Sequence, residues 1–258
     1  MKRLRDVIDD LKRLGATNAP ADLADRVLTQ AGLVDSYAAF EMVIGRVFVA
    51  WSQNGVSSAS RDATPADFEA RFKEEVGRPL ISATPPKAMT AKLEDELAGR
   101  KRLSFDLRGL TDFERDVLVK TREIPRGQVR PYAWVAREIG HPAAVRAVGS
   151  ALARNPIPYF IPCHRVVRSD GVIGNYGGGG PVAKRKILMQ EGVQPDRLET
   201  LARSGIRYEG SRTTHIFCFP TCRHGLRVAE QNRIFFRSES AAREAGYRPC
   251  KVCRPAAA

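Results

Sequence analysis

Two close pairs of cysteines near the C-terminal end constrain this chain more than any other feature. Three residues separate Cys218 from Cys222, two separate Cys250 from Cys253, and 27 residues lie between the pairs. Cysteine pairs at such spacings are typical ligands of tetrahedral zinc. Four thiolates fill the coordination sphere of zinc, so the spacing alone favours a structural zinc. Redox-active cysteine pairs without a metal are an alternative to any zinc site. The pattern predicts a small zinc module in this part of the chain.

The fifth cysteine, Cys163, stands alone in the segment Ile161-Pro162-Cys163-His164-Arg165-Val166. A neighbouring base such as His164 raises the thiolate fraction, which is typical of a nucleophile. Glu191, further along the chain, can orient that histidine. The glycine-rich segment 174–180 permits close approach to a ligand, but no Gly-Lys-Ser/Thr follows it, so it is not a phosphate loop. A hydrolase and a buried structural cysteine stay open as alternatives.

Basic residues are concentrated in the segments that carry cysteines. The net charge is +13, and residues 1–105 are close to balance, with 16 Lys/Arg against 15 Asp/Glu. Residues 106–195 hold 14 against 8, and residues 205–258 hold 10 against 4. A localised excess of this kind indicates contact with a polyanion such as nucleic acid. General solubility is the alternative explanation.

The hydrophobic residues do not form a membrane segment. No apolar run approaches the roughly 20 residues of a membrane span. The first residues are charged, unlike a signal peptide. A cytoplasmic, reducing setting is therefore expected, in which cysteine pairs serve as metal ligands more often than as disulfides.

Periodicity predicts three kinds of structure before the cysteines. Residues 1–34 read as two helices, a packing appendage. Residues 38–60 alternate as strands, with Asn54-Gly55 as a strong hairpin signal, and Leu103, Phe105 and Leu107 alternate as a further strand. Two short helices are expected at about 132–139 and 142–153.

The second of these two helices has an unusual composition. The pair has the length of a helix-turn-helix. Its second helix is rich in small residues and offers few long side chains for reading bases, apart from Arg146 and Arg154. Such a helix can lie close against a DNA groove with one arginine projecting. Tight helix–helix packing is the alternative.

The order and spacing of several motifs resemble the O6-alkylguanine-DNA alkyltransferase family from about residue 111 to 193. Residues 38–107 resemble the ribonuclease-H-like N-terminal domain of that family more weakly. The motifs that carry the resemblance are Arg146-Ala147-Val148-Gly149, Arg154-Asn155-Pro156, Ile161-Pro162-Cys163-His164-Arg165-Val166-Val167, Gly174-Asn175-Tyr176 and Glu191-Gly192.

The resemblance implies a role for each residue of the motif around the single thiol. Cys163 is the acceptor that takes an alkyl group from O6 of guanine and keeps it. His164 acts as a base through a water molecule, and Glu191 orients it. Asn155 lies at the hinge between the helix-turn-helix and the active-site strand.

The resemblance also implies a set of residues that act on DNA. Arg146 fills the space that the flipped nucleotide leaves. Tyr132 crowds the phosphate and favours flipping, and is therefore counted among the catalytic residues. Tyr176 and the glycine loop line the base pocket, although relatives often have serine where Gly177 stands. The expected DNA-binding residues are Arg146, Ala147, Arg154, Tyr176 and Gly177.

The segment around the four thiols, about 214–255, resembles the zinc module of the Ada family of methyl-phosphotriester repair proteins. The resemblance implies one Zn²⁺ held by Cys218, Cys222, Cys250 and Cys253, with Cys218 also acting as a methyl acceptor. Phe219 stands where close relatives have arginine, and the module lies C-terminal rather than N-terminal. A zinc that is only structural, or serves DNA binding alone, stays the alternative.

Together these features predict a multidomain α+β protein with five segments. These are a helical appendage (1–34), a small ribonuclease-H-like α/β domain (35–107), a helical, winged helix-turn-helix-like alkyltransferase domain (108–195), a linker (196–210) and a zinc module (211–258). No organic cofactor is expected.

The expected function is stoichiometric repair by a monomer. Its partner is double-stranded DNA carrying O6-alkylguanine and, from the second resemblance, methyl phosphotriesters; no membrane is involved. A lesion sensor that does not transfer is the first alternative, but sensors of that kind lack the acceptor that Cys163 provides. A methylation-responsive regulator is the second, and it would need a separate operator-reading unit.

Overall fold

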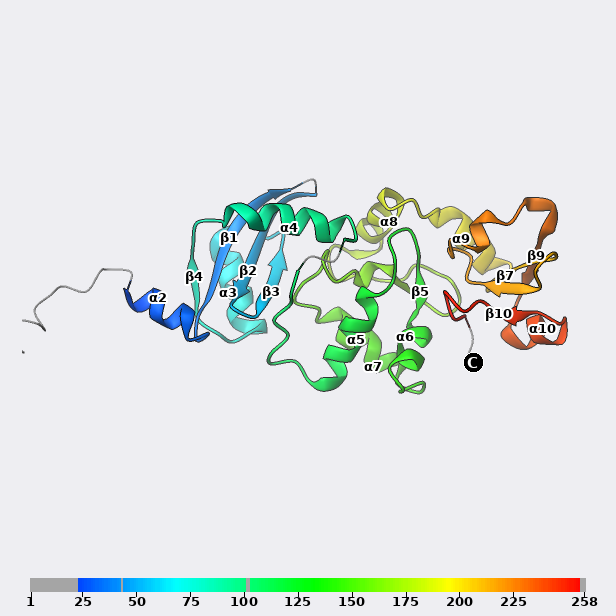
Figure 1. Ribbon diagram of the computed structural model, residues 1–258, viewed down its shortest axis with the longest axis horizontal. Coiled ribbons are helices and arrows are strands. Elements are labelled where there is room, and N and C mark those ends of the chain that lie inside the picture. Colours follow the sequence, from blue (N-terminus) through cyan, green and yellow to red (C-terminus); the bar gives the residue numbers. More distant parts are fainter. Residues whose placement is uncertain (1–22, 43, 101–102, 256–258) are drawn as a thin grey trace, which may run out of the picture.

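A computed structural model describes three units that follow one another along the long axis of the molecule (Figure 1). The described residues are 23–42, 44–100 and 103–255. The first expected helix of the segment 1–34 lies outside them. The described part of this segment contains the helix α2 (Leu23–Gln30), whose residues Val27 and Leu28 are exposed.

A four-stranded sheet forms the first unit, with the strand order β3-β2-β1-β4. The three longer strands are antiparallel neighbours, and the short β4 runs parallel to β1. Its strands are β1 (Asp35–Met42), β2 (Gly45–Ser52), β3 (Gly55–Ser60) and β4 (Leu80–Ser82).

Both faces of this sheet are covered, because successive side chains of a strand point to opposite sides. Phe48 of β2 packs with Phe68 on one face, and its neighbour Val47 belongs with Leu93 to the core on the other. The covering helices are α3 (Pro65–Glu75) and α4 (Lys87–Leu97). The small α/β unit expected from the alternating pattern is therefore present.

The hairpin predicted at Asn54-Gly55 is confirmed. The β2 strand pairs with β3 in antiparallel register up to Ser52 and Gly55. Gly55 has a φ of +126°, and a Cβ there would lie 2.3 Å from the carbonyl oxygen of Ser104. Only glycine fits this position, since it combines a positive φ with close backbone contact.

The strand predicted over residues 103–107 is wrong. This segment forms one isolated bridge, between Phe105 and Val56 of β3. The Asp106 carboxylate accepts a hydrogen bond from the Arg108 backbone N–H at 3.1 Å, and Gly109 follows with a φ of +88°. The chain therefore turns away before a second pair of ladder hydrogen bonds can form.

Helices dominate the second unit. Thr111 and Glu114 form a capping box at the start of α5. The two expected short helices are confirmed as α6 and α7, but α7 begins at Val145, because the Ala144 N–H bonds the His141 carbonyl in a turn. The elements are α5 (Asp112–Arg122), β5 (Arg130–Pro131), α6 (Tyr132–Glu138), α7 (Val145–Ala153), the short 3-10 helix η1 (Cys163–Arg165), β6 (Val166–Val167) and α8 (Gly180–Gln190).

A second four-stranded sheet forms the last unit, in the order β10-β8-β7-β9. Its central strand, β7, is antiparallel to both β8 and β9. The elements are α9 (Pro195–Arg203), β7 (Tyr208–Ser211), β8 (Ile216–Cys218), η2 (Gly225–Arg227), η3 (Glu230–Asn232), β9 (Arg233–Phe236), α10 (Glu239–Glu244) and β10 (Arg248–Pro249).

The segment 196–210, predicted as a linker, contains most of α9 and the first residues of β7. We propose that the C-terminal module begins before Tyr208, because β7 supplies the pairing for two neighbouring strands. One apolar core joins all three units: it contains Leu93 of α4, Val148 of α7 and the four clustered cysteines. Among the described residues, no helix combines the length and apolar character needed to cross a bilayer.

This placement of β7 predicts different behaviour for two fragments. Residues 202–258 should gain sheet structure when zinc is added, because metal binding and folding are coupled in small zinc units. Residues 211–258 lack the central strand and should stay unfolded. Circular dichroism with and without zinc measures this, with Cys250→Ser in the longer fragment as the control. Equal zinc-dependent folding of both fragments would contradict the expectation.

Candidate active site and metal centre

Cys163 opens the 3-10 turn η1 directly after Pro162, and 8% of its surface is exposed. Asn155, in the loop after α7, fixes this turn from one side. Its Nδ2 donates to the Ile161 carbonyl oxygen at 3.0 Å and lies 3.3 Å from Cys163 Sγ, while its Oδ1 accepts from the Ile157 N–H at 3.0 Å. One amide group thus holds both ends of the loop and contacts the thiol.

Glu191, at the end of α8, joins His164 and Arg165 in a largely buried network. His164 Nε2 lies 3.0 Å from Glu191 Oε1, so this nitrogen carries the proton that the carboxylate accepts. Arg165 donates to both carboxylate oxygens at 2.8 and 2.7 Å, and to the Ile124 carbonyl oxygen at 2.8 Å. His164 Nδ1 is buried and has no hydrogen-bond partner among the described residues.

Burial and these contacts set the charges of the site. Burial raises the pKa of the Cys163 thiol above 9.0, against the opposing effect of Asn155. Burial also lowers the pKa of His164 below 6.5, although Glu191 opposes this. Burial alone would raise the pKa of Glu191, but hydrogen bonds from His164 and Arg165 outweigh it and hold that pKa at about 2. At neutral pH the site is a thiol, a neutral imidazole and a carboxylate.

A pocket of about 410 Å³ opens onto the thiol. Its lining includes Cys163, Tyr132 at the start of α6, Gly149 of α7, Asn175, Tyr176 and Gly177. The structure thus brings together four of the predicted residues: the acceptor cysteine, both tyrosines and Gly177.

Tyr176 lines this pocket, and its hydroxyl is buried beside Gly178. Its ring meets the ring of His164 edge to face, with 6.2 Å between centroids. Its hydroxyl is buried without a hydrogen-bond partner in the described part of the chain, and burial raises its pKa, so it stays protonated. A buried hydroxyl without a partner is uncommon in folded proteins and points to a ligand that supplies one.

Lys184 supports the site from behind, and the sequence analysis did not identify it. Its Nζ donates to the carbonyl oxygens of Val166 at 2.6 Å and Asn175 at 3.2 Å. Burial lowers its pKa to about 8. Lys184 sits in a basic run that looks like a solvated helix face. Its spacing of four from the buried Leu188 is the one local signal of an inward position.

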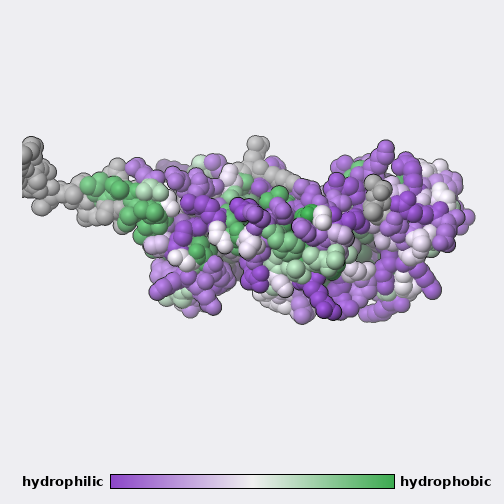
Figure 2. Space-filling model, turned by 90° about the horizontal axis from the view of Figure 1, so that it is seen from below, coloured by the Kyte–Doolittle hydropathy of each residue, from purple (hydrophilic) through white to green (hydrophobic). Residues whose placement is uncertain are grey.

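The predicted DNA-contacting residues outside the pocket lie on or just after α7. Arg146 and Ala147 are exposed on this helix. Arg154 instead donates to Glu114 of α5, at 3.1 and 2.6 Å. Figure 2 views the side on which α5 and α7 lie and shows pale apolar surface over the middle of the molecule, bordered by hydrophilic atoms. A helix face with short, weakly polar side chains, flanked by basic ones, can make close contact with a DNA groove.

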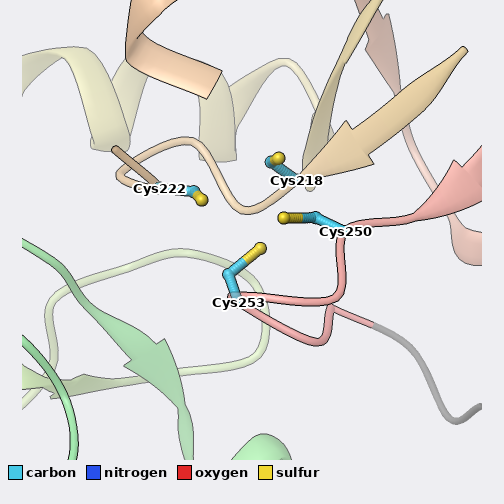
Figure 3. A group of neighbouring side chains, drawn as sticks. All are labelled: Cys218, Cys222, Cys250 and Cys253. Carbon is cyan, nitrogen blue, oxygen red and sulfur yellow. The ribbon is translucent and has the colours of Figure 1, made fainter. Parts of the chain in front are cut away.

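The four remaining cysteines converge at one point in the third unit (Figure 3). All four are buried, and their Sγ atoms lie within 4.8 Å of one another. Sulfurs at 2.3 Å from a tetrahedral zinc stand about 3.8 Å apart, so this set fits the ion. Cys218 ends β8 and Cys250 follows β10, and a hydrogen bond from the Cys250 N–H to the Phe217 carbonyl at 2.9 Å links the two segments.

A second pocket, of about 340 Å³, lies beside this cluster. Cys218 and Cys250 line it, and so do the basic residues Arg233, Arg248 and Lys251. Phe219 points elsewhere: its ring packs against Tyr208, with 5.8 Å between centroids. Of the four cysteines, Cys218 and Cys250 thus border a basic pocket.

The fold and the two sites define the class of protein. It combines the fold of the 6-O-methylguanine DNA methyltransferases with an appended metal-binding module. The family model "6-O-methylguanine DNA methyltransferase, DNA binding domain" matches residues 112–193, and "Metal binding domain of Ada" matches residues 202–256. The chain belongs to the methylated-DNA–protein-cysteine methyltransferase family.

Relatives of this family cover different parts of the chain. The Methanosarcina barkeri protein is 34% identical over 166 residues, which are 60% of this chain and 96% of that protein. The Salmonella typhimurium protein is 40% identical over 135 residues, 51% of this chain and 78% of that protein. The Rattus norvegicus protein is 49% identical over 82 residues, 31% of this chain, and the match spans 39% of its own length.

The electrostatics of the site predict how alkylation of Cys163 depends on pH. Because the pKa of His164 lies below 6.5, its base form persists as the pH falls from about 8 to 6.5, and the rate should stay level there. The rate should decline only below that range, as the imidazole gains a proton. The pH profile of Cys163 labelling by free O6-benzylguanine measures this. A decline that begins above pH 7, or the same profile in His164→Gln, would contradict it.

Proposed function

We propose that the protein transfers the alkyl group of O6-alkylguanine in double-stranded DNA to Cys163, once per molecule. The observation that carries this proposal is the buried thiol that opens into a pocket, contacted by Asn155 and followed directly by a neutral histidine paired with Glu191. Membership of the methyltransferase family supports it, and so does the basic charge of the central unit.

The transfer is a displacement at carbon. The Cys163 sulfur forms a bond to the alkyl carbon as the bond from that carbon to guanine O6 breaks. The thiol proton passes through His164, by way of a water molecule, and the departing guanine takes up one proton, so atoms and charge balance. Glu191 stays ionised throughout and stabilises the imidazolium that forms in passing. The product is a thioether, for which no group in the site offers a route back.

The pocket requires the base to leave the duplex. O6 of a stacked guanine lies out of reach of an enclosed thiol, so the nucleotide must flip outward. Tyr132 and Tyr176 then face it inside the pocket. Arg146, exposed on α7, is placed to occupy the gap in the helix stack, while Ala147 permits close approach and Arg154 and Gly177 complete the DNA-contacting set.

Replacing the acceptor tests this proposal. Cys163→Ala should bind DNA carrying O6-methylguanine but remove no methyl group, because no other thiol reaches the pocket. The wild type should remove one O6-methyl group per molecule and stop. Intact-mass measurement after incubation with the DNA checks both, with Cys253→Ser as a control for cysteine loss elsewhere. An unchanged mass of the wild type would indicate a lesion sensor, and continued turnover would indicate a hydrolase.

We propose further that the metal centre binds Zn²⁺ through Cys218, Cys222, Cys250 and Cys253, and that Cys218 accepts a methyl group from a methyl phosphotriester in DNA. Zinc keeps a thiol deprotonated at neutral pH. The Cys218 sulfur then bonds the methyl carbon as the carbon–oxygen bond breaks, and the phosphate leaves as an ordinary diester anion. The basic pocket beside Cys218 supports this role.

Two consequences separate this second transfer from a purely structural zinc. DNA with methyl phosphotriesters should add one methyl group to Cys218, and zinc should stay bound by the other three cysteines. Peptide mapping with zinc quantification measures both, and Arg248→Gln should slow the transfer by about tenfold through one lost phosphate contact. Zinc without any methyl on the four cysteines would leave a structural role. Methyl on Cys250 would assign the acceptor to the other cysteine of the pocket.

Both transfers need reduced thiols, so the proposal includes a reducing setting.

A further inference from the structure

The metal centre is attached to the central unit by polar contacts close to its ligands. The Val129 N–H, just before β5, donates to Thr221 Oγ1 at 2.9 Å, and Thr221 directly precedes Cys222. Arg137 of α6 donates to the carbonyl oxygen of Arg254 at 2.6 Å. The Arg254 side chain returns to α6 and pairs with Glu138 at 2.5 Å. Segments next to Cys222 and Cys253 are thus fixed to β5 and α6, which lie beside them in Figure 1.

Arg130 is the central unit's buried charge at this junction. It belongs to β5, and 2% of its surface is exposed. Its guanidinium lies 5.4 Å from the ring centroid of Phe219, the residue after Cys218, and 5.7 Å from that of Trp134. It is therefore enclosed between the metal module and α6.

The hydrogen bonds of Arg130 do not neutralise it. Its donors reach the Val129 carbonyl oxygen at 2.8 Å and Gln128 Oε1 at 2.7 Å, both uncharged acceptors. Among the described residues, no carboxylate forms an ion pair with it, and the charges that act on it most strongly are those of the four cysteines. A buried arginine without a counter-charge is strongly unfavourable. The cysteine cluster is the available counter-charge, since four thiolates around a divalent ion leave a net double negative charge.

We propose that Arg130 is the counter-cation of the four-thiolate centre and couples the charge of that centre to α6. The proposal rests on the zinc binding proposed above. Arg130 makes the dianionic, metal-loaded cluster more stable, and the cluster makes the buried guanidinium tolerable. When the metal leaves and the thiolates take up protons, or when one thiolate becomes a thioether, the negative charge of the cluster falls and this attraction weakens.

The coupling has a short path to the other acceptor site. Arg130 stands two residues before Tyr132, which begins α6 and lines the pocket of Cys163. A change in the packing of β5 therefore shifts the first residue of the helix that borders the alkyl-acceptor pocket. The state of the metal centre is in this way communicated to the pocket in which a flipped base would be held.

Metal release from the full-length, zinc-loaded protein tests the charge. Arg130→Gln should lose zinc to excess EDTA about tenfold faster than the wild type, because one buried positive charge beside the cluster is gone. Arg130→Lys keeps the charge and should stay within about twofold of the wild type. Arg137→Gln removes one positive charge and the hydrogen bond to the segment after Cys253, so it is the comparison variant whose zinc release should lie between those of the wild type and Arg130→Gln.

Two patterns of release would overturn the proposal. One is Arg130→Gln releasing zinc no faster than Arg137→Gln. The other is Arg130→Lys releasing it as fast as Arg130→Gln, which would mean that shape rather than charge matters.

A measurement on the wild type keeps the test independent of how the variants fold. Hydrogen exchange of the β5–α6 segment, residues 129–136, should speed up at least about tenfold when zinc is extracted, while α5 serves as the internal reference and stays unchanged. Unchanged exchange in residues 129–136 would overturn the coupling. Zinc content before extraction separates the two hypotheses: a wild type without zinc overturns the metal site and the coupling with it, whereas zinc present with unchanged exchange overturns the coupling alone.

Discussion

The carboxylate of Glu191 is the interaction on which the acceptor site depends. It lies at the C-terminal end of α8 and accepts hydrogen bonds from His164 and Arg165, which follow Cys163 in the same turn. Without it, two cationic or basic groups would be buried unpaired, which costs several kcal/mol. One buried carboxylate therefore holds a helix end, a loop and a base in a single geometry. Burial keeps the imidazole neutral, and the carboxylate favours the protonated form that arises when the imidazole takes a proton.

The protein holds its two sets of thiols by opposite means. Cys163 is kept as a neutral thiol by burial, and the neutral imidazole of His164 follows it directly in the chain. The thiols of the third unit are instead grouped within 4.8 Å of one another, an arrangement suited to sharing one metal ion. A lone thiol protected by protonation and a cluster protected by a cation both limit side reactions with small electrophiles.

The junction between the central unit and the metal module is polar at a place where interfaces are usually apolar. Trp134 and Phe219 supply the apolar part, but the Arg130 guanidinium lies against both rings. Burial of this positive charge is energetically tolerable only if the cysteine cluster carries negative charge.

Local patterns in the sequence were enough to identify the reactive elements. Each of these features depends on contacts between residues close in sequence, or on the ligand preference of a metal. They are the cysteine spacings, the Cys163-His164 pair, Asn54-Gly55, and the paired helices α6 and α7. The extended segment 103–107 looked like a strand because alternation says nothing about whether a partner edge is available. No pattern in the sequence predicts the burial of Lys184 and Arg130, which only the tertiary structure shows. Whether a charge is exposed, or becomes the counter-ion of a distant cluster, depends on which remote segment packs against it, and that information is absent from its sequence neighbours.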